Sequence, residues 1–374
     1  MKERRSVVDN ALRPVRALYV AAVRPIQEAY NALPASVRRW TMPAVLLLGF
    51  LLSLAAPSLI NLYWQQVLIY VGINIILAAS LNLINGYMGE FSVGHAGFMA
   101  VGAYVASIMT VWVFPRMGLK EAVPYLFPLA LTIGGLAAGL TGLVVAIPSF
   151  RTRGDYLAIV TLAWNMIVKS VLENLDVVGG PRGFMGMQKL TNLPWVFVWV
   201  VVTIYLLRNL IYSNLGRGIL SIREDEIASS LVSVDTRRVK IVAFVISSFF
   251  AGVAGGLFAH IIQFIDPRTF SILKSTDVLV MVYLGGIGSL GGSILGASIY
   301  TILMELLRPL QVWRWVVGPL LLVLLMIFRP RGIMGLREWG FLIPKEERPA
   351  FVDALREQVR QKREPAAVPA GASE

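Results

Sequence analysis

The chain has 374 residues, of which 56% are hydrophobic and 15% are charged, and it contains no cysteine. Soluble domains carry about 25% charged residues, so this composition excludes an ordinary soluble protein, and the missing cysteines exclude disulfides and thiol chemistry. The net charge of +12 fits basic residues that set orientation in a membrane rather than a surface that binds nucleic acid.

Residues 1–40 form a basic leader with eight Lys and Arg residues and an apolar residue at every third or fourth position. This pattern predicts an amphipathic helix on the cytoplasmic surface of the membrane, and a disordered basic leader is the alternative. The sequence thus predicts a leader over 1–40, a transmembrane domain over 41–335 and a partly disordered cytoplasmic tail over 336–374.

Long stretches without Asp, Glu, Lys or Arg follow the leader. They cover 41–89, 91–115, 122–150, 190–207, 241–265 and 278–304. Because about 20 apolar residues cross a bilayer as a helix, they predict an all-α polytopic membrane protein. Turn and charge signals divide it into about ten spans, or eight if 276–307 dips in and out of the membrane. The ten lie near 42–60, 62–84, 91–113, 124–147, 155–173, 194–213, 240–263, 276–288, 293–307 and 314–328.

The basic residues give an independent test of this topology. The leader carries eight of them, the loop 214–240 five and the tail 329–374 nine. Ten spans place these three segments on one side, together with the short loop that holds Arg151 and Arg153. The positive-inside rule makes that side the cytoplasm, so both termini are expected there.

The stretch 86–107 combines glycines with isolated polar side chains inside a predicted span. Glycine-interrupted segments in both halves of a membrane protein point to a translocation pathway, although close helix packing explains each glycine equally well. The candidate pathway residues of this stretch are Ser92, Gly94, His95, Gly97 and Tyr104. We find no catalytic triad, carboxylate pair or metal-ligand pattern, and therefore expect neither an enzyme nor a metal site.

The stretch 283–297, YLGGIGSLGGSILGA, contains a G-x-G-x-x-G pattern at Gly286, Gly288 and Gly291. This is the pattern of a dinucleotide-binding turn. The stretch lies in an uncharged membrane segment, which cannot provide the open sheet edge and the crevice of a nucleotide site. We expect these glycines to permit close packing or to break a helix beside a cavity, and they are further candidate pathway residues.

The hydrophilic loop 214–240 predicts a short amphipathic helix. Asp225 and Glu226 suit the first turn of a helix that begins there. Such a helix would lie on the membrane or insert into the groove of a partner, and the residues alone do not decide between the two. The apolar residues assigned to one face of it are Leu220, Ile227, Leu231 and Val234.

Several blocks between residues 62 and 335 resemble the LivM-type permease subunits of branched-chain amino acid ABC transporters. They are LNLINGYMGEFSVGHAGFMAVGAY (81–104), GDYLAIVTLA (154–163), the loop 215–240, AFVISSFFAGVAGGL (243–257), VYLGGIGSLGGSILGA (282–297) and FRPRGIMG (328–335). The resemblance implies an importer permease of the bacterial inner membrane. It also implies two ATP-binding subunits, a homologous second permease and a periplasmic substrate-binding protein as partners.

In this family the cytoplasmic loop is the contact with the ATP-binding subunits, so the resemblance implies that 214–240 couples ATP hydrolysis to transport. The chain contains no G-x-x-x-x-G-K-[ST], and we expect ATP to be hydrolysed by the partner subunits, with no cofactor in this chain. The candidate coupling residues are Gly216, Arg217, Arg223, Glu224, Asp225, Glu226 and Ala228.

The resemblance implies a cargo of branched-chain or other hydrophobic amino acids, with urea or short amides as the nearest variant. Glu90 departs from the family, in which glutamine is expected, and this carboxylate either alters substrate preference or is simply solvated. The alternative of another class is an ATPase-independent channel or an ion-coupled secondary transporter, which leaves the loop 214–240 without a partner.

Overall fold

The computed structural model describes residues 35–151 and 156–313, together with short stretches between 316 and 347, and it describes side chains from residue 45 onward. These residues are almost entirely helical. This confirms the all-α membrane fold that the composition predicts. The predicted leader up to residue 34, most of the span 314–328 and most of the tail lie outside the described residues.

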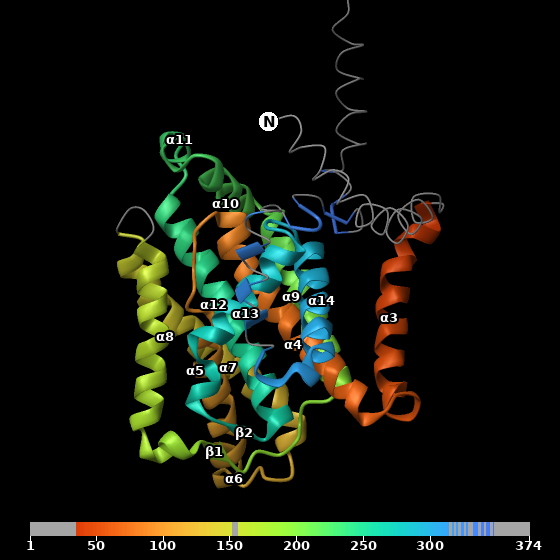
Figure 1. Ribbon diagram of the computed structural model, residues 1–374. Helices are drawn as coiled ribbons and strands as arrows, with labels where there is room; N and C mark the ends of the chain where they lie inside the picture. The colour runs from red at the N-terminus through yellow and green to blue at the C-terminus, as the bar shows by residue number, and fades with distance from the viewer. Residues whose placement is uncertain are drawn as a thin grey trace, which may run out of the picture.

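Nine longer helices form the bundle (Figure 1). They are α3 (Ala35–Leu59), α4 (Leu62–Asn82), α5 (His95–Ile108), α7 (Val123–Ser149), α8 (Tyr156–Asn174), α9 (Leu193–Ile211), α12 (Thr236–Ile262), α13 (Ile272–Gly285) and α14 (Leu290–Leu306), counted over the described residues. The short α-helices are α6 (Phe114–Arg116), α10 (Asn214–Glu224) and α11 (Glu226–Leu231).

Short irregular elements connect the helices. The π-helical turns are η1 (Leu83–Met88) and η2 (Met109–Val113), and the 3₁₀ turns are η3 (Asp176–Val178), η4 (Gly180–Arg182), η5 (Pro267–Phe270) and η6 (Arg308–Trp313). The strands β1 (Phe184–Met185) and β2 (Phe264–Ile265) pair antiparallel, with Phe184 opposite Ile265. The two strands connect segments that lie far apart in the sequence.

Six helical segments of the described part are long and apolar enough to cross a membrane. They are Leu62–Met88, His95–Arg116, Val123–Ser149, Tyr156–Asn174, Leu193–Ile211 and Thr236–Ile262, with Val45–Leu59 and Leu290–Leu306 as shorter apolar helices. The predicted spans 276–288 and 293–307 correspond to α13 and α14. These helices have 14 and 17 residues, so at about 1.5 Å per residue each is shorter than the ~30 Å hydrocarbon core.

The described parts of three segments predicted to share one side of the membrane, the loop 214–240, the end of α7 before Arg151 and a stretch of the tail, lie at one end of the bundle. The helices α10 and α11 of the loop 214–240 lie at this end, and β1, β2 and α6 lie at the other (Figure 1). The Phe150 ring, just before Arg151, lies 5.8 Å from Nζ of Lys240. In the described part of the tail, Met334 donates its backbone N–H to Gly285 O at 2.9 Å.

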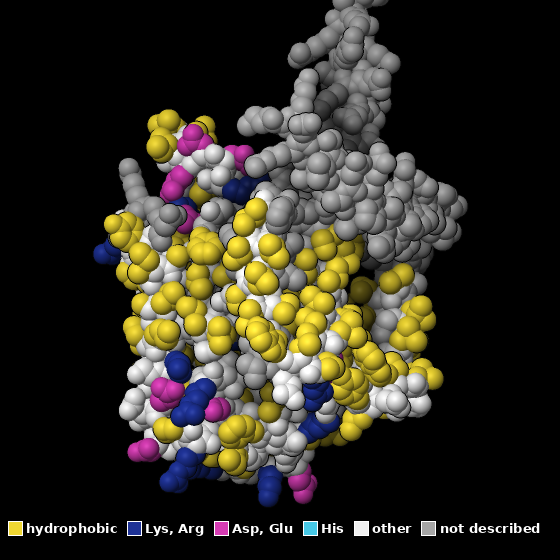
Figure 2. Space-filling model, in the orientation of Figure 1, with side chains coloured by type: hydrophobic (Ala, Val, Ile, Leu, Met, Phe, Trp, Pro, Cys, Tyr) yellow, Lys and Arg dark blue, Asp and Glu magenta, His cyan; other side chains and the backbone are white. Residues whose placement is uncertain are grey.

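The outer surface between the two ends is apolar. Figure 2 shows a band of hydrophobic side chains across the middle of the molecule, with charged side chains gathered toward both ends. On α7, the successive side chains of Leu136, Leu140 and Val144 all point outward and are exposed. A soluble protein rarely exposes an apolar surface of this extent, and lipid is the solvent that accounts for it.

The centre of the bundle is built on close contacts between glycines. A Cβ added at Gly102 of α5 would lie 2.2 Å from Gly252 Cα of α12, and one added at Gly255 would lie 1.9 Å from Met99 O. Lipid is as apolar as a leucine side chain, so membrane helices associate through such close packing and through hydrogen bonds. One of these bonds joins α12 to α4, because Ser247 Oγ donates to Ser80 O at 2.6 Å.

We predict that Gly255→Ala destabilises the chain, because the added methyl group would overlap Met99 O. Overpacking of this kind costs about 1–3 kcal/mol. Thermal unfolding of the full chain in detergent measures the effect. The control is Gly139→Ala, whose Cβ would meet its nearest neighbour at 3.6 Å. Equal melting temperatures for the two variants would contradict the proposed packing constraint.

Candidate coupling surface and translocation pathway

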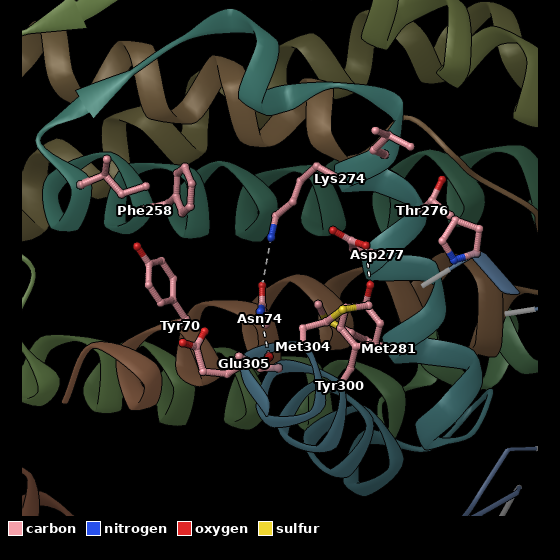
Figure 3. A pocket seen from close by; sticks show the side chains of 14 residues that line it. Tyr70, Asn74, Phe258, Lys274, Thr276, Asp277, Met281, Tyr300, Met304 and Glu305 are labelled. Atoms are coloured by element: carbon pink, nitrogen blue, oxygen red, sulfur yellow. Dashed lines mark hydrogen bonds between the residues drawn. The ribbon is translucent and has the colours of Figure 1, made fainter. Parts of the chain in front are cut away.

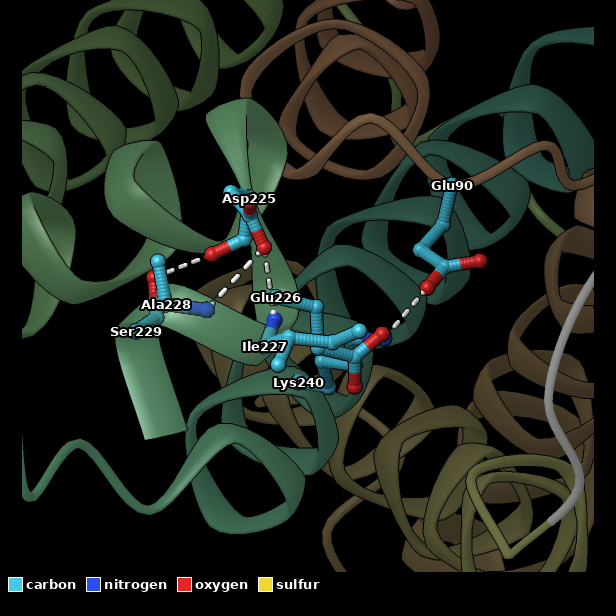
Figure 4. Close-up of polar contacts among 7 residues, drawn as sticks. All are labelled: Glu90, Asp225, Glu226, Ile227, Ala228, Ser229 and Lys240. Carbon is cyan, nitrogen blue, oxygen red and sulfur yellow. Dashed lines mark hydrogen bonds and ion pairs between the residues drawn. The ribbon is translucent and has the colours of Figure 1, made fainter. Parts of the chain in front are cut away.

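The loop 214–240 folds into two short helices rather than one. Asp225 has an extended backbone (φ −160°) that separates them. Its Oδ1 accepts from the backbone N–H groups of Ile227 at 2.9 Å and Ala228 at 3.0 Å (Figure 4). The predicted helix start at Asp225 and Glu226 is therefore confirmed. The predicted single apolar face is wrong, because Leu220 belongs to α10 and Val234 lies beyond the end of α11.

The second helix, α11, projects from the bundle and exposes apolar side chains. Ile227 is 70% exposed, Leu231 80% and Val232 72%. Figure 2 shows a hydrophobic cluster at this tip, bordered by acidic side chains. Exposed apolar side chains with a polar rim are typical of a protein interaction site. We call Ile227, Leu231 and Val232 the α11 tip.

Lys240 joins this loop to the candidate pathway. Its Nζ lies 2.6 Å from Glu90 Oε1 and 2.8 Å from Glu226 Oε2, and its side chain is 7% exposed (Figure 4). The interpretation of Glu90 as a simply solvated carboxylate is therefore wrong. One buried cation connects the start of α12, the segment before α5 and the first turn of α11.

Arg223 forms a second connection between the loop and the pathway stretch. It pairs with Glu224 at 2.7 Å, and its Nη1 donates to Gly86 O at 3.3 Å. Gly89 adopts a φ of +78°, and a Cβ at this position would lie 2.8 Å from Arg223 Cγ. The Arg223 side chain thus points partly into the bundle, whereas the Glu224 side chain is 73% exposed.

The remaining candidate coupling residues lie on α10. Gly216 sits against the end of α9, because a Cβ there would lie 2.0 Å from Ile211 O. Ser213 Oγ accepts from Gly216 N at 3.3 Å and caps α10. Arg217 is exposed on the same helix. A glycine at position 216 therefore allows the sharp turn that places α10 across the end of the bundle.

The candidate pathway residues near the start of α5 lie at helix contacts. A buried His95 shares a hydrogen bond of 2.9 Å with Ser80 Oγ of α4. Gly94 and Gly97 allow close approach to α8, since added Cβ atoms would lie 2.1 Å from Thr161 O and 3.0 Å from Asn165 Cα.

Two polar side chains complete this group. Ser92 is buried and donates its backbone N–H to Asn85 Oδ1 at 3.2 Å, and Tyr104 OH donates to Ile265 O at 3.5 Å. Each predicted residue of the stretch therefore has a packing or bonding role within the chain. Contact with a cargo stays a prediction.

Gly286 and Gly288 form the turn between α13 and α14, with φ values of +137° and +75°. The Asn82 side chain at the end of α4 holds this turn. Its Oδ1 accepts from Gly288 N at 2.9 Å, and its Nδ2 donates to Ser289 O and to Ser293 Oγ, both at 2.8 Å. The glycines therefore break the helix, as one of the two expectations has it, and the Asn82 side chain lies beside the break.

A carboxylate of the chain itself occupies the N-terminus of α14. Glu338 accepts from Leu290 N at 2.6 Å and Gly291 N at 2.8 Å. Burial raises the pKa of the Glu338 carboxyl, and the N–H groups of Gly291, Trp339 and Leu290 lower it. The third glycine of the G-x-G-x-x-G pattern thus binds an anion at a helix N-terminus, and this anion comes from the tail.

The structure brings the glycine-rich stretches 86–107 and 283–297 into contact. In the sequence they share only a similar composition of glycines. A Cβ added at Gly86 would lie 2.4 Å from Gly288 N. Asn82 bonds the turn 286–289, and Ser80, two residues earlier, bonds His95. The end of α4 therefore separates the two groups of candidate pathway residues and contacts both of them.

A cavity of about 370 Å³ lies elsewhere in the bundle, between α4, α12, α13 and α14 (Figure 3). None of the predicted pathway residues lines it. Its charged residues are Lys274, Asp277 and Glu305. In the sequence these three flank the uncharged stretch 278–304. The sequence shows only that charges stand at both ends of this stretch, and they come together because α14 packs back along α13.

Among the described residues, no group of three His, Cys, Asp or Glu side chains is placed to hold a metal ion. The arrangement consists of an exposed tip, ion pairs of Arg223 and the buried Lys240 beside interrupted helices, and a cavity between helices. These features suit a moving membrane pathway.

Comparison with known proteins identifies the family. Residues 63–329 match the family described as branched-chain amino acid transport system / permease component. The chain belongs to this family. It is 32% identical to the high-affinity branched-chain amino acid transport system permease protein LivM of Escherichia coli K12 over 318 residues, which cover 76% of this chain and 72% of that protein.

Other relatives extend this assignment. The LivM protein of Salmonella typhimurium is 30% identical over 356 residues, which cover 86% of this chain and 81% of that protein. The permease protein LivH of Escherichia coli K12 is 25% identical over 283 residues, covering 70% of this chain and 90% of LivH. No solved structure matches the chain. The relatives are transport permease components rather than enzymes, as the sequence predicts.

We predict that Lys240→Met impairs transport by this permease and destabilises the chain, because Glu90 loses its partner in a largely buried position. Solute uptake by membrane vesicles measures the effect on transport, and the melting temperature of the chain in detergent measures the effect on stability. Loss of one partner of a partly buried pair costs about 1–3 kcal/mol. Adding Glu90→Gln, which removes the unpaired charge, should restore part of the stability. The pairing is refuted if the double variant is no more stable than Lys240→Met.

Proposed function

We propose that this chain is the permease subunit of an ATP-binding cassette importer that moves branched-chain or other hydrophobic amino acids across the bacterial inner membrane. The α11 tip is the observation that carries the proposal. It is an exposed apolar surface on a helix that Glu226 connects to the interior through its ion pair with the buried Lys240. A partner that presses on this helix would move those connections.

The proposed coupling follows two routes into the bundle. One runs from Glu226 through Lys240 to Glu90, just before α5. The other runs from Arg223 to Gly86 O in η1, next to the turn between α13 and α14. Both routes end where helices are interrupted. A force on α10 and α11 would therefore act on segments that can change conformation without breaking the hydrogen bonds of a regular helix.

The proposed assembly contains two ATP-binding subunits, a homologous second permease and a periplasmic substrate-binding protein. The names LivM and LivH, given to two permease proteins of one bacterium, support a pair of different permeases. ATP is hydrolysed in the separate subunits, and this chain holds no cofactor. The end of the bundle that carries α10 and α11 faces the cytoplasm in this proposal, and both termini lie there.

Two other functions predict different behaviour. The same machine carrying urea or short amides would differ only in its cargo. A channel or an ion-coupled secondary transporter would work without an ATPase and would need no protein partner at the α11 tip. The exposure of Ile227 and Leu231 therefore favours an ATP-driven machine.

We predict that Ile227→Asp with Leu231→Asp abolishes binding of the ATP-binding subunits while the chain stays inserted, because two charges replace the apolar contact. The chain is purified from its native membranes in mild detergent, and co-purifying ATPase activity is measured. The control is Val177→Asp, which alters an exposed apolar residue in η3. The control should retain the ATPase.

The outcomes of this experiment are distinct. Loss of the ATPase in the double variant alone supports the coupling surface. ATPase retained by the double variant would reject the α11 tip as the contact. Solute movement by the wild-type chain alone in liposomes, without ATP, would reject the importer and favour a secondary transporter.

A further inference from the structure

The cavity between α4, α12, α13 and α14 contains two opposite charges from one helix turn. Lys274 and Asp277 lie three residues apart in the first turns of α13, so their side chains leave the helix on the same side. Figure 3 shows both reaching from α13 into the space beside α4 and α14. Its volume of about 370 Å³ falls within the range of small-molecule sites, about 300–1,000 Å³.

Neither of these charges forms a salt bridge in the part of the chain that the structure describes, although each interacts electrostatically with the other. Lys274 Nζ donates to the amide oxygen of Asn74 at 3.3 Å and lies 6.0 Å from the centre of the Phe258 ring. The Asp277 carboxylate accepts from Tyr300 OH. Lys274 and Asp277 do not approach each other within ion-pair distance. Both are partly buried, and neutral hydrogen bonds compensate a buried charge only in part.

The rest of the cavity wall is mainly apolar. Phe258 and Tyr70 stand on one side, and Met281 and Met304 on the other (Figure 3). Methionine side chains adapt to irregular apolar shapes. Glu305 lies at the margin, where it accepts from Tyr63 OH and pairs with Arg308 at 3.0 Å. An acidic side chain on a ligand would meet repulsion there.

We propose that this cavity is a binding site for a zwitterionic amino acid within the permease. Lys274 binds the α-carboxylate, Asp277 binds the α-ammonium, and the aliphatic side chain lies between the aromatic rings and the methionines. A zwitterion offers a direct ion-pair partner to each of the two charges, neither of which forms a salt bridge among the described residues, and a neutral urea or amide offers none. This inference rests on the proposed function and deepens it, because it selects amino acids over urea among the cargoes of the same machine.

The first experiment measures equilibrium binding of radiolabelled leucine to the complete transporter in nanodiscs, without the periplasmic protein. Lys274→Met and Asp277→Asn should each weaken leucine binding about thirtyfold or more, as expected when one partner of a buried charge pair is removed. Excess urea and acetamide should not displace leucine. The matched control is Lys169→Met, which breaks a partly exposed pair with Glu173 on α8 and should bind leucine like the wild type.

Two half-ligands assign each charge. The first is 4-methylpentanoate, which keeps the carboxylate of leucine and lacks the ammonium. It should lose its ability to displace leucine only in Lys274→Met. The second is 3-methylbutylamine, which keeps the ammonium, and it should lose this ability only in Asp277→Asn. A merely structural role of the two residues would weaken both probes equally in both variants, and that result overturns the proposal.

Other outcomes separate this proposal from the proposed function. If both variants bind leucine like the wild type, or if urea displaces leucine, the cavity is not a zwitterion site. ATP-driven leucine uptake by such a transporter would leave the importer assignment intact. If neither ATPase activity nor leucine uptake accompanies the wild-type chain, the proposed function fails together with the site that rests on it.

Discussion

The structure depends on one side chain, Asn82, which satisfies the backbone where two interrupted helices meet. Inside a bilayer an unpaired N–H or C=O costs several kcal/mol, at about the level of a lost hydrogen bond in hydrocarbon. The turn between α13 and α14 leaves its N–H and C=O groups outside any helix, and Asn82 bonds Gly288 N, Ser289 O and Ser293 Oγ. Non-helical backbone can therefore exist beside the end of α4, next to η1 and Gly86.

These interruptions are also the points that the cytoplasm-facing loop reaches in the proposed function. Arg223 bonds Gly86 O, Lys240 pairs with Glu90, and Glu338 of the tail caps α14. Charged groups at one end of the bundle thus bind at or beside the interruptions, Arg223 at the backbone of η1, Lys240 at the Glu90 carboxylate and Glu338 at the first N–H groups of α14. Regular helices transmit force as rigid bodies, whereas a broken helix has alternative conformations, so contacts of this kind suit a pathway that opens and closes.

Charge has two different roles in the chain. Basic side chains of the described loops gather toward the ends of the bundle (Figure 2), where the positive-inside rule gives such residues a role in orientation. Lys274 and Asp277 differ because they line a cavity between helices and form no salt bridge in the described part of the chain. Charged residues among membrane helices are costly, and their usual role is in function rather than in packing. The cavity and the α11 tip lie on different elements, so the cargo site and the ATPase contact that we propose are separate sites.

The sequence by itself determined the all-α membrane fold, the family and the helix start at Asp225, because apolar length, motif blocks and local capping depend on neighbours in the chain. It did not determine that α10 and α11 are two helices, since the extended backbone of Asp225 disrupts a periodicity that spans both. The pairing of Glu90 with Lys240, 150 residues away, also appeared only in the tertiary structure. So did the cavity, because Lys274 and Glu305 flank an uncharged stretch and meet only when α14 folds back along α13.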